Sequence, residues 1–251
     1  MTAPPIAHIE RVELPCADRH ATAHFYGELF GWHARHDDAR EHTGFDAPPG
    51  PGGAYISVAE PQARAGEALL YAGTDDIAAT LGRIEAAGGT TLVPRTEVPG
   101  RVWFAFFADP SGNRLGLVEV PEYTPATPPP ATPHPIAHLA IPAHDPHAAA
   151  AFYNATLGWK TQRDTALGAV GFAPINGISG SFPQIDSKQH RAGQIVIYAA
   201  TDDVGALLDK AATLGAQVTP PPTTNNAGIQ HGRFTDPDGN TIGVLKPSAH
   251  P

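Results

Sequence analysis

Two pairs of polar side chains, each with one residue between its members, have the residue types needed for proton transfer. Arg11 and Glu13 form the first pair, and His231 and Arg233 form the second. A carboxylate or an imidazole can accept a proton, and a guanidinium stabilises the negative charge that develops on a substrate. Glu13 or His138 would then act as a general base. Arg11 or Arg233 would stabilise an enolate or carboxylate, and His231 is a further catalytic candidate.

Each of these candidates also has a structural explanation. Arg11 and Glu13 could form an ion pair on an outward face, because residues i and i+2 share one side of a strand. His138 could be an ordinary hydrogen-bonded histidine of a strand. The choice depends on the elements that position these side chains.

Those elements follow from an internal repeat with a constant offset of 127 residues. The matching motifs are Phe25-Tyr26 with Phe152-Tyr153, Gly31-Trp32 with Gly158-Trp159, Thr74-Asp75-Asp76 with Thr201-Asp202-Asp203, and Asp109-Pro110 with Asp236-Pro237. A constant offset means that the two copies align without net insertion. The repeat predicts two homologous domains, 1–120 and 135–251. The proline-rich segment 121–134 between them is expected to be a semi-rigid linker.

Within each copy the hydrophobic pattern switches from strand to helix and back. Residues 9–14 alternate with period two, as expected for a half-buried strand. Asp18 is predicted to cap the following helix and Gly31 to end it. Asp145 and Pro146 begin the matching helix of the second copy. A further strand, helix and three strands follow, so each copy is predicted to contain two βαβββ units.

This order of elements resembles the vicinal oxygen chelate superfamily, which includes glyoxalase I, extradiol dioxygenases, fosfomycin-modifying enzymes and bleomycin-resistance proteins. The motifs behind the resemblance are Phe-Tyr on the first helix, Gly-Trp at its end, Thr-Asp-Asp before the second helix, and Asp-Pro-x-Gly-Asn before the last strand. The resemblance covers nearly the whole chain. It implies an α+β fold of tandem domains, each of two βαβββ units, that form cup-shaped mixed sheets around ligand cavities.

The resemblance also implies where a metal would bind. The ligand positions of metal-dependent members fall on Arg11, Tyr55 or Ser57, Leu69 and Gly116 in the first copy, and on His138, Phe182 or Gln184, Val196 and Gly243 in the second. Only His138 is a plausible ligand, and one imidazole does not hold a catalytic metal. We therefore expect neither a metal nor another cofactor.

Glycine at both of the last ligand positions has two explanations. Gly116 and Gly243 could leave room for a bound molecule, or they could accommodate a bulky side chain on a neighbouring strand.

The resemblance implies a ligand in the interior of the cup. The predicted ligand-binding residues are Tyr55, Tyr71, Trp103, Phe104, Phe182, Gln184, Tyr198 and Arg233. Register does not decide between Trp103 and Phe104, or between Gln230 and His231, as the inward member of each pair. Tyr71 and Tyr198 could also be purely structural, because aromatic side chains pack well on sheets.

Composition limits the class of protein. The 251 residues are 41% hydrophobic and 16% charged, as expected for a globular chain, and the formal net charge of −9 argues against a nucleic-acid partner. Lone Cys16 cannot form an internal disulfide, which favours a cytoplasmic location. No apolar run approaches the roughly 20 residues of a membrane helix, so no membrane partner is expected. We expect a monomer, as an internal pseudo-dimer, or a homodimer.

These features predict a metal-independent protein that binds a small, largely apolar organic metabolite. The first interpretation is an enzyme of isomerase, cyclase or lyase type, because such reactions need proton transfer and no redox cofactor. The alternative is a protein that sequesters a drug or metabolite without chemistry, as bleomycin-resistance proteins do. A metal-dependent glyoxalase or dioxygenase is a third interpretation.

Overall fold

The computed structural model describes residues 4–100, 102–119, 131–164, 169–186, 189–219, 221–225 and 228–247. Residues 121–130 of the predicted linker lie outside these ranges. The first copy forms β1 (Ile9–Cys16), α1 (Arg19–Phe30), β2 (His33–Asp37), a 3-10 turn (Asp38–Arg40), β3 (His42–Asp46), β4 (Gly53–Ser57), β5 (Leu69–Gly73), α2 (Ile77–Ala86), β6 (Thr90–Val98), β7 (Val102–Ala108) and β8 (Arg114–Glu119). The second copy forms β9 (Ile136–Ala140), α3 (Pro146–Leu157), β10 (Thr161–Asp164), β11 (Ala169–Ile175), β12 (Ile178–Ser181), β13 (Val196–Ala200), α4 (Val204–Thr213), β14 (Gln217–Val218), β15 (Thr223–Thr224), β16 (Gln230–Thr235) and β17 (Thr241–Leu245).

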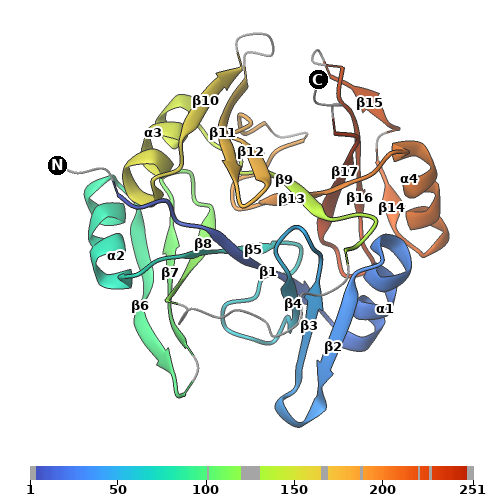
Figure 1. Ribbon diagram of the computed structural model, residues 1–251, viewed down its shortest axis with the longest axis horizontal. Coiled ribbons are helices and arrows are strands. Elements are labelled where there is room, and N and C mark those ends of the chain that lie inside the picture. The colour runs from blue at the N-terminus through green and yellow to red at the C-terminus, as the bar shows by residue number, and fades with distance from the viewer. Residues whose placement is uncertain are drawn as a thin grey trace. The chain divides into compact units, whose positions relative to one another are not determined.

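The strands form two mixed sheets, one from each copy (Figure 1). The strand order is β2-β3-β4-β1-β5-β8-β7-β6 in the first sheet and β10-β11-β12-β9-β13-β17-β16-β14 in the second, where β15 pairs with β16. Parallel pairs such as β5–β8 and β13–β17 adjoin antiparallel pairs such as β7–β8 and β16–β17. The predicted α+β class and the repeated βαβββ order are therefore confirmed.

The helix ends form as their sequences predict. The carboxylates of Asp18 and Asp145 each accept hydrogen bonds from two backbone N–H groups at the start of α1 and α3. Gly31 and Gly158 end these helices with φ of 69°, in the left-handed region that favours glycine. Before α2, the cap is Asp76, whose side chain accepts from the N–H of Ala79. None of the helices in the described residues is long and apolar enough to cross a membrane.

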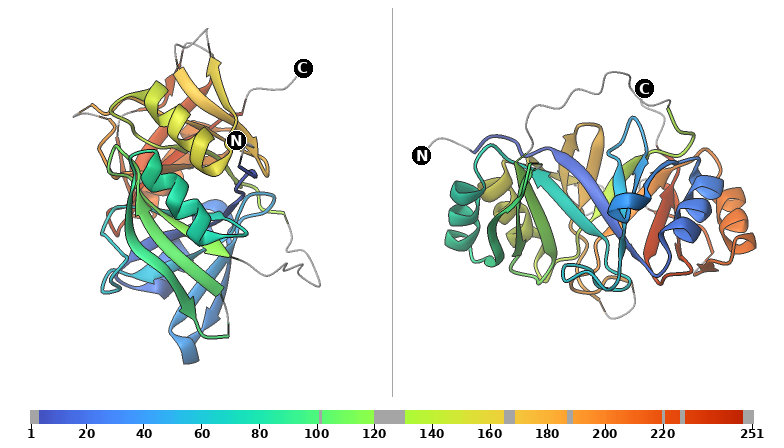
Figure 2. Two further views of the ribbon diagram at one scale, coloured as in Figure 1. Left: turned by 90° about the vertical axis from the view of Figure 1, so that its left-hand side faces the viewer. Right: turned by 90° about the horizontal axis from the view of Figure 1, so that it is seen from below.

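Contacts divide the chain into two compact units. The first unit comprises Met1–Arg11, Leu69–Pro128 and Ala140–Ile195, and the second unit comprises Val12–Ala68, Pro129–Leu139 and Val196–Pro251. In the first unit α2 lies beside α3, and in the second unit α1 lies beside α4 (Figure 2). Each unit therefore combines one βαβββ unit from each copy, a division that differs from the predicted domains 1–120 and 135–251.

The Asp-Pro-x-Gly-Asn turns connect elements of different copies within each unit. In the second unit, Asp236 accepts a hydrogen bond from the backbone N–H of Asn240 and another, of 2.7 Å, from the hydroxyl of Tyr26. In the first unit, Asp109 accepts the hydroxyl of Tyr153 at 2.9 Å. The tyrosine of one copy thus pairs with the turn of the other, which explains why each unit draws on both copies.

Candidate functional site

The second unit brings several predicted residues together on one side of the second sheet. Gly243 of β17 lies opposite Tyr198 of β13 in one ladder and opposite Arg233 of β16 in the next. Nε of Arg233 donates a 2.6 Å hydrogen bond to the hydroxyl oxygen of Tyr198. The ring of His138 on β9 lies edge-on to the Tyr198 ring, with 5.6 Å between centroids. We call His138, Tyr198, His231 and Arg233 the Tyr198 face.

The structure decides which residue at the start of β16 belongs to this face. His231 shares a side of the strand with Arg233, because the two are separated by one residue. The residue between them, Gly232, points toward α4: a Cβ there would lie 2.6 Å from Cδ1 of Leu208. Gln230 therefore lies on the α4 side, and His231 lies on the Tyr198 face.

Burial sets the protonation of the Tyr198 face. The pKa of His138 is lowered from 6.5 to about 4. Burial is the larger cause, and repulsion from a protonated His231 is the smaller one. The pKa of His231 is also lowered, by burial and then by Arg233. Burial raises the pKa of Tyr198, although Arg233 opposes the shift. At neutral pH the face carries two neutral imidazoles, a protonated phenol and a guanidinium.

Arg233 supplies the one full charge on the strands of this face at neutral pH. β9, β13, β16 and β17 contain no Asp, Glu or Lys, although the whole chain has a formal net charge of −9. A cation among strands without carboxylates attracts an anionic group. The Tyr198 face is therefore suited to a ligand that carries or develops negative charge.

The first unit contains the equivalent face with different chemistry. Cζ of Arg11 lies 5.6 Å from the centroid of the Tyr71 ring. Tyr71 and Phe106 belong to one buried cluster, and Phe104 packs against it. We call Arg11, Tyr71, Phe104 and Phe106 the Tyr71 face. The Tyr71 face is mostly aromatic, and its positive charge comes from Arg11 on β1, the first strand of the chain.

The offset of 127 residues makes the contrast between the two faces specific. Phe104 occupies the position of His231, and Phe106 occupies that of Arg233. Phe106 was not among the predicted site residues, and its correspondence with Arg233 is the signal that could have identified it. The two faces thus carry their guanidinium on different strands: Arg11 is on β1, whereas Arg233 is on β16.

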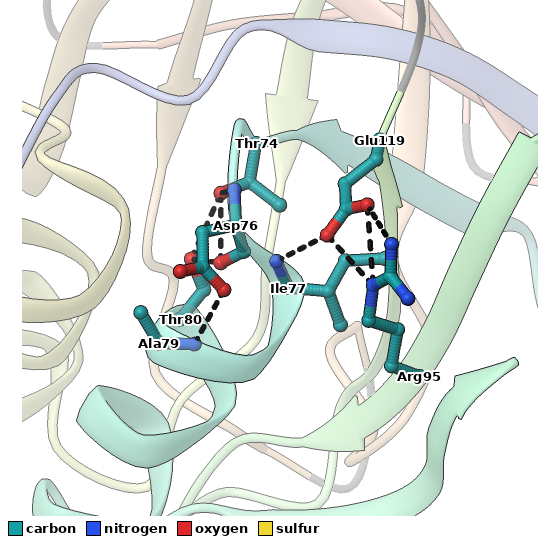
Figure 3. A network of polar contacts seen from close by, with 7 residues as sticks. All are labelled: Thr74, Asp76, Ile77, Ala79, Thr80, Arg95 and Glu119. Atoms are coloured by element: carbon teal, nitrogen blue, oxygen red, sulfur yellow. Dashed lines mark hydrogen bonds and ion pairs between the residues drawn. The ribbon is translucent and has the colours of Figure 1, made fainter.

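Trp103 lies on the other side of β7, where α2 packs, and not with Tyr71 as one alternative predicted. Cζ of Arg95 lies 3.6 Å from the centroid of a Trp103 ring. Arg95 also pairs with Glu119 at 2.7 Å, and Glu119 accepts the N–H of Ile77 at the start of α2 (Figure 3). Trp103 thus supports the contact between sheet and helix.

Three other predicted ligand-binding residues lie away from the two faces. Tyr55 is buried and stacks on Tyr26 of α1, and Phe182 is buried and stacks on Tyr153 of α3. Gln184 is exposed and donates a 3.3 Å hydrogen bond to the carbonyl of His144. The first two point toward helices because period-two alternation places them on the helix side of their strands.

Glu13, the other predicted base, lies in the second unit but in the first sheet. It faces Ala54 of β4 in the parallel ladder and is 6% exposed. Glu13 thus lies on β1 of the first sheet, whereas the residues of the Tyr198 face lie on β9, β13 and β16 of the second sheet.

Tyrosine rings fill the space beside Gly116 and Gly243, the two positions at which the resemblance implies a carboxylate ligand of a divalent metal. A Cβ on Gly243 would lie 2.2 Å from Cδ1 of Tyr198, and one on Gly116 would lie 2.3 Å from Cδ1 of Tyr71. The two glycines therefore accommodate neighbouring side chains. In the part of the chain that the structure describes, no three His, Cys, Asp or Glu side chains gather as a metal site requires. The residues present do not fit that metal.

Comparisons with known proteins agree with the fold. A family model described as Glyoxalase/Bleomycin resistance protein/Dioxygenase superfamily matches residues 135–244, and one described as Glyoxalase-like domain matches residues 11–118. Proteins of Mycobacterium bovis and Mycobacterium tuberculosis named "Putative glyoxylase CFP32" are 27% identical to this chain over 94% of each sequence.

Solved structures show the same fold. The 2,3-dioxygenase LapB from Pseudomonas sp. KL28 is 15% identical with a TM-score of 0.65, over 100% of this chain and 95% of that one. The Mn(II)-bound glyoxalase from Novosphingobium aromaticivorans is 16% identical with a TM-score of 0.62, over 96% of this chain and 82% of that one. With the two matching family models, the motifs and the paired sheets, the chain belongs to the Glyoxalase/Bleomycin resistance protein/Dioxygenase superfamily, also called the vicinal oxygen chelate superfamily.

Proposed function

We propose that the Tyr198 face binds a small organic molecule with an anionic or enolisable group and moves a proton on it. His138 accepts the proton, while the hydroxyl of Tyr198 and the guanidinium of Arg233 stabilise the negative charge. One observation supports this most strongly: Arg233 donates to the Tyr198 oxygen at 2.6 Å, beside an imidazole that is neutral at pH 7.

The proposed reaction balances without an oxidant or a reductant. When His138 takes a proton from a carbon next to a carbonyl group, the C–H bond breaks and its electron pair passes to the carbonyl oxygen. The oxygen of Tyr198 already accepts from Arg233, so its own proton can be donated to that oxygen. Return of the proton to another carbon gives an isomer, and loss of a β-substituent gives a lyase product.

Negative charge on the ligand strengthens the base. A pKa of about 4 makes His138 a weak proton acceptor in the ligand-free protein. A carboxylate or a developing enolate beside it favours the imidazolium and raises that pKa. The absence of Asp and Glu from β9, β13, β16 and β17 suits such an anion.

Family membership supports a small-molecule substrate. The superfamily includes enzymes and binding proteins for small molecules, and the mycobacterial relatives carry the name of a glyoxylase. Sequestration without chemistry is the second candidate. It is favoured by the Tyr71 face, where Phe104 and Phe106 replace His231 and Arg233.

Deuterium exchange distinguishes these candidates. We expect the protein in D2O to exchange the C3 protons of pyruvate or phenylpyruvate, which lie next to the keto group, and proton NMR follows their loss. The exchange rate should fall at least tenfold in His138→Gln and in Arg233→Gln. His33→Gln, a change at an exposed histidine of β2, is the matched control and should exchange like the unchanged protein. Equal exchange by His138→Gln would refute the proposal. Recovery of stoichiometrically bound, undeuterated ligand would favour sequestration.

A further inference from the structure

A cleft of about 730 Å³ lies in the first unit and shares no residue with the Tyr198 face. It is bordered by the segment 5–8, the start of β1, the end of β5, the middle of α2 and the end of α3. Its volume falls within the roughly 300–1,000 Å³ that is typical of small-molecule sites.

One part of the cleft wall is apolar. Val102 at the start of β7 and Val118 near the end of β8 contribute to it, and Ile6 adds a side chain that is 46% exposed. Exposure of a large aliphatic side chain beside two valines leaves an apolar surface that a ligand can cover.

Another part of the wall carries opposite charges. The guanidinium of Arg83 is held between α2 and α3, because Nη2 donates to the Thr80 hydroxyl at 2.7 Å and Nε donates to the Thr156 carbonyl at 3.2 Å. Thr80 appears in Figure 3 on the first turns of α2. Glu10 lies over Gly73, where a Cβ would meet its Oε1 at 2.7 Å. Within the described residues, neither Arg83 nor Glu10 forms an ion pair.

The second unit shows that packing alone does not require this polar wall. At the offset of 127 residues, Glu10, Gly73, Thr80 and Thr156 correspond to Ala137, Ala200, Leu207 and Leu29. Leu207 and Leu29 are 5% and 1% exposed, so they fill the equivalent positions with buried aliphatic groups. The polar wall is specific to the first unit.

We propose that the cleft binds a small zwitterion with an apolar side chain, such as leucine or phenylalanine. Arg83 receives the carboxylate, Glu10 receives the ammonium group, and the apolar wall covers the side chain. A ligand with only a negative charge would be repelled by Glu10, and a ligand with only a positive charge would be repelled by Arg83 and Arg11. A zwitterion satisfies both signs, which is why we choose this class of ligand.

Isothermal titration calorimetry with the full chain tests the proposal. We expect L-phenylalanine and L-leucine to bind with one site per chain. 3-Phenylpropionate, which lacks the ammonium group, and phenethylamine, which lacks the carboxylate, should bind at least tenfold more weakly. Equal binding of either analogue, or no binding of the amino acids at millimolar concentration, would overturn the proposal.

Substitutions place the ligand in the cleft. Glu10→Gln changes an exposed side chain and should weaken L-phenylalanine binding at least tenfold, as should Arg83→Met. Lys210→Met, at the position in the second unit that corresponds to Arg83, is the matched control and should bind normally. Should Arg83→Met fail to fold, Glu10→Gln alone decides. Unchanged affinity in Glu10→Gln would contradict the proposed site.

Discussion

The hydroxyl of Tyr26 donates a 2.7 Å hydrogen bond to Oδ2 of Asp236, a residue 210 positions further along the chain. Both side chains are buried. A buried carboxylate is costly unless its oxygens accept hydrogen bonds. This bond therefore joins the first helix of one copy to the last turn of the other inside the second unit.

Removing that hydroxyl should destabilise the fold. We expect Tyr26→Phe to lower the free energy of unfolding by about 2 kcal/mol, because a hydrogen bond to a charged, buried acceptor is lost. Urea denaturation measures the change. The matched control is Tyr55→Phe, because Tyr55 stacks on Tyr26 and its hydroxyl makes no hydrogen bond among the described residues. An equal loss in the control would assign the effect to the ring stack.

The close approach of Tyr198 to Gly243 makes a second prediction. Gly243→Ala would place a Cβ 2.2 Å from Cδ1 of Tyr198, so the ring must move. We expect a loss of about 1–3 kcal/mol in the free energy of unfolding, together with loss of proton exchange. The same change in a Tyr198→Ala background should cost much less. Additive effects of the two substitutions would contradict the proposed clash.

Arg95 should contribute to stability without affecting the proposed chemistry. It lies over Trp103 and pairs with Glu119 near the start of α2. We expect Arg95→Ala to lower the free energy of unfolding only slightly, and by less in high salt, because exposed ion pairs contribute little and are screened. Proton exchange should be unchanged. A loss of proton exchange in Arg95→Ala would contradict this assignment and would indicate that Trp103, which Arg95 contacts, takes part in ligand binding.

The lowered pKa of His138 predicts how stability depends on pH. An imidazole with an ordinary pKa of 6.5 in the unfolded chain and about 4 in the folded chain resists protonation on folding. Its contribution to stability is complete above pH 6.5 and is lost as the pH falls toward 4, by about 3 kcal/mol. Urea denaturation at pH 7 and pH 4 should show a smaller difference for His138→Gln than for the unchanged protein. Equal differences would show that His138 does not carry the effect.

Much of the fold could be predicted from local signals. The capping residues Asp18 and Asp145 and the glycines at the helix ends each act over a few residues, and all appear where expected. The repeat with its offset of 127 residues predicts that both copies contain the same elements. The pairing of Tyr26 with Asp236 could not be predicted in this way, because nothing local to either motif specifies its partner. The boundaries of the two compact units could not be predicted for the same reason, because they depend on contacts between the two copies.

The sequence predicts which residues form the candidate site better than it predicts the side of the strand on which each side chain lies. His138, Tyr198, His231 and Arg233 were all candidates, and the structure brings them together. Alternation alone left Trp103 and Phe104 equivalent, and only the position of α2 separates them. Tyr55 and Phe182 were placed near the ligand by analogy of position, but their rings complete the stacks beneath α1 and α3.

The most direct measurement is a proton NMR titration of the His138 ring, assigned by comparison with His138→Gln. We predict that the ring titrates at a pKa of about 4 in the ligand-free protein and at a higher pKa when phenylpyruvate is bound. A pKa near 6.5 in the ligand-free protein, or one that phenylpyruvate leaves unchanged, would contradict a buried neutral base acting beside Tyr198 and Arg233.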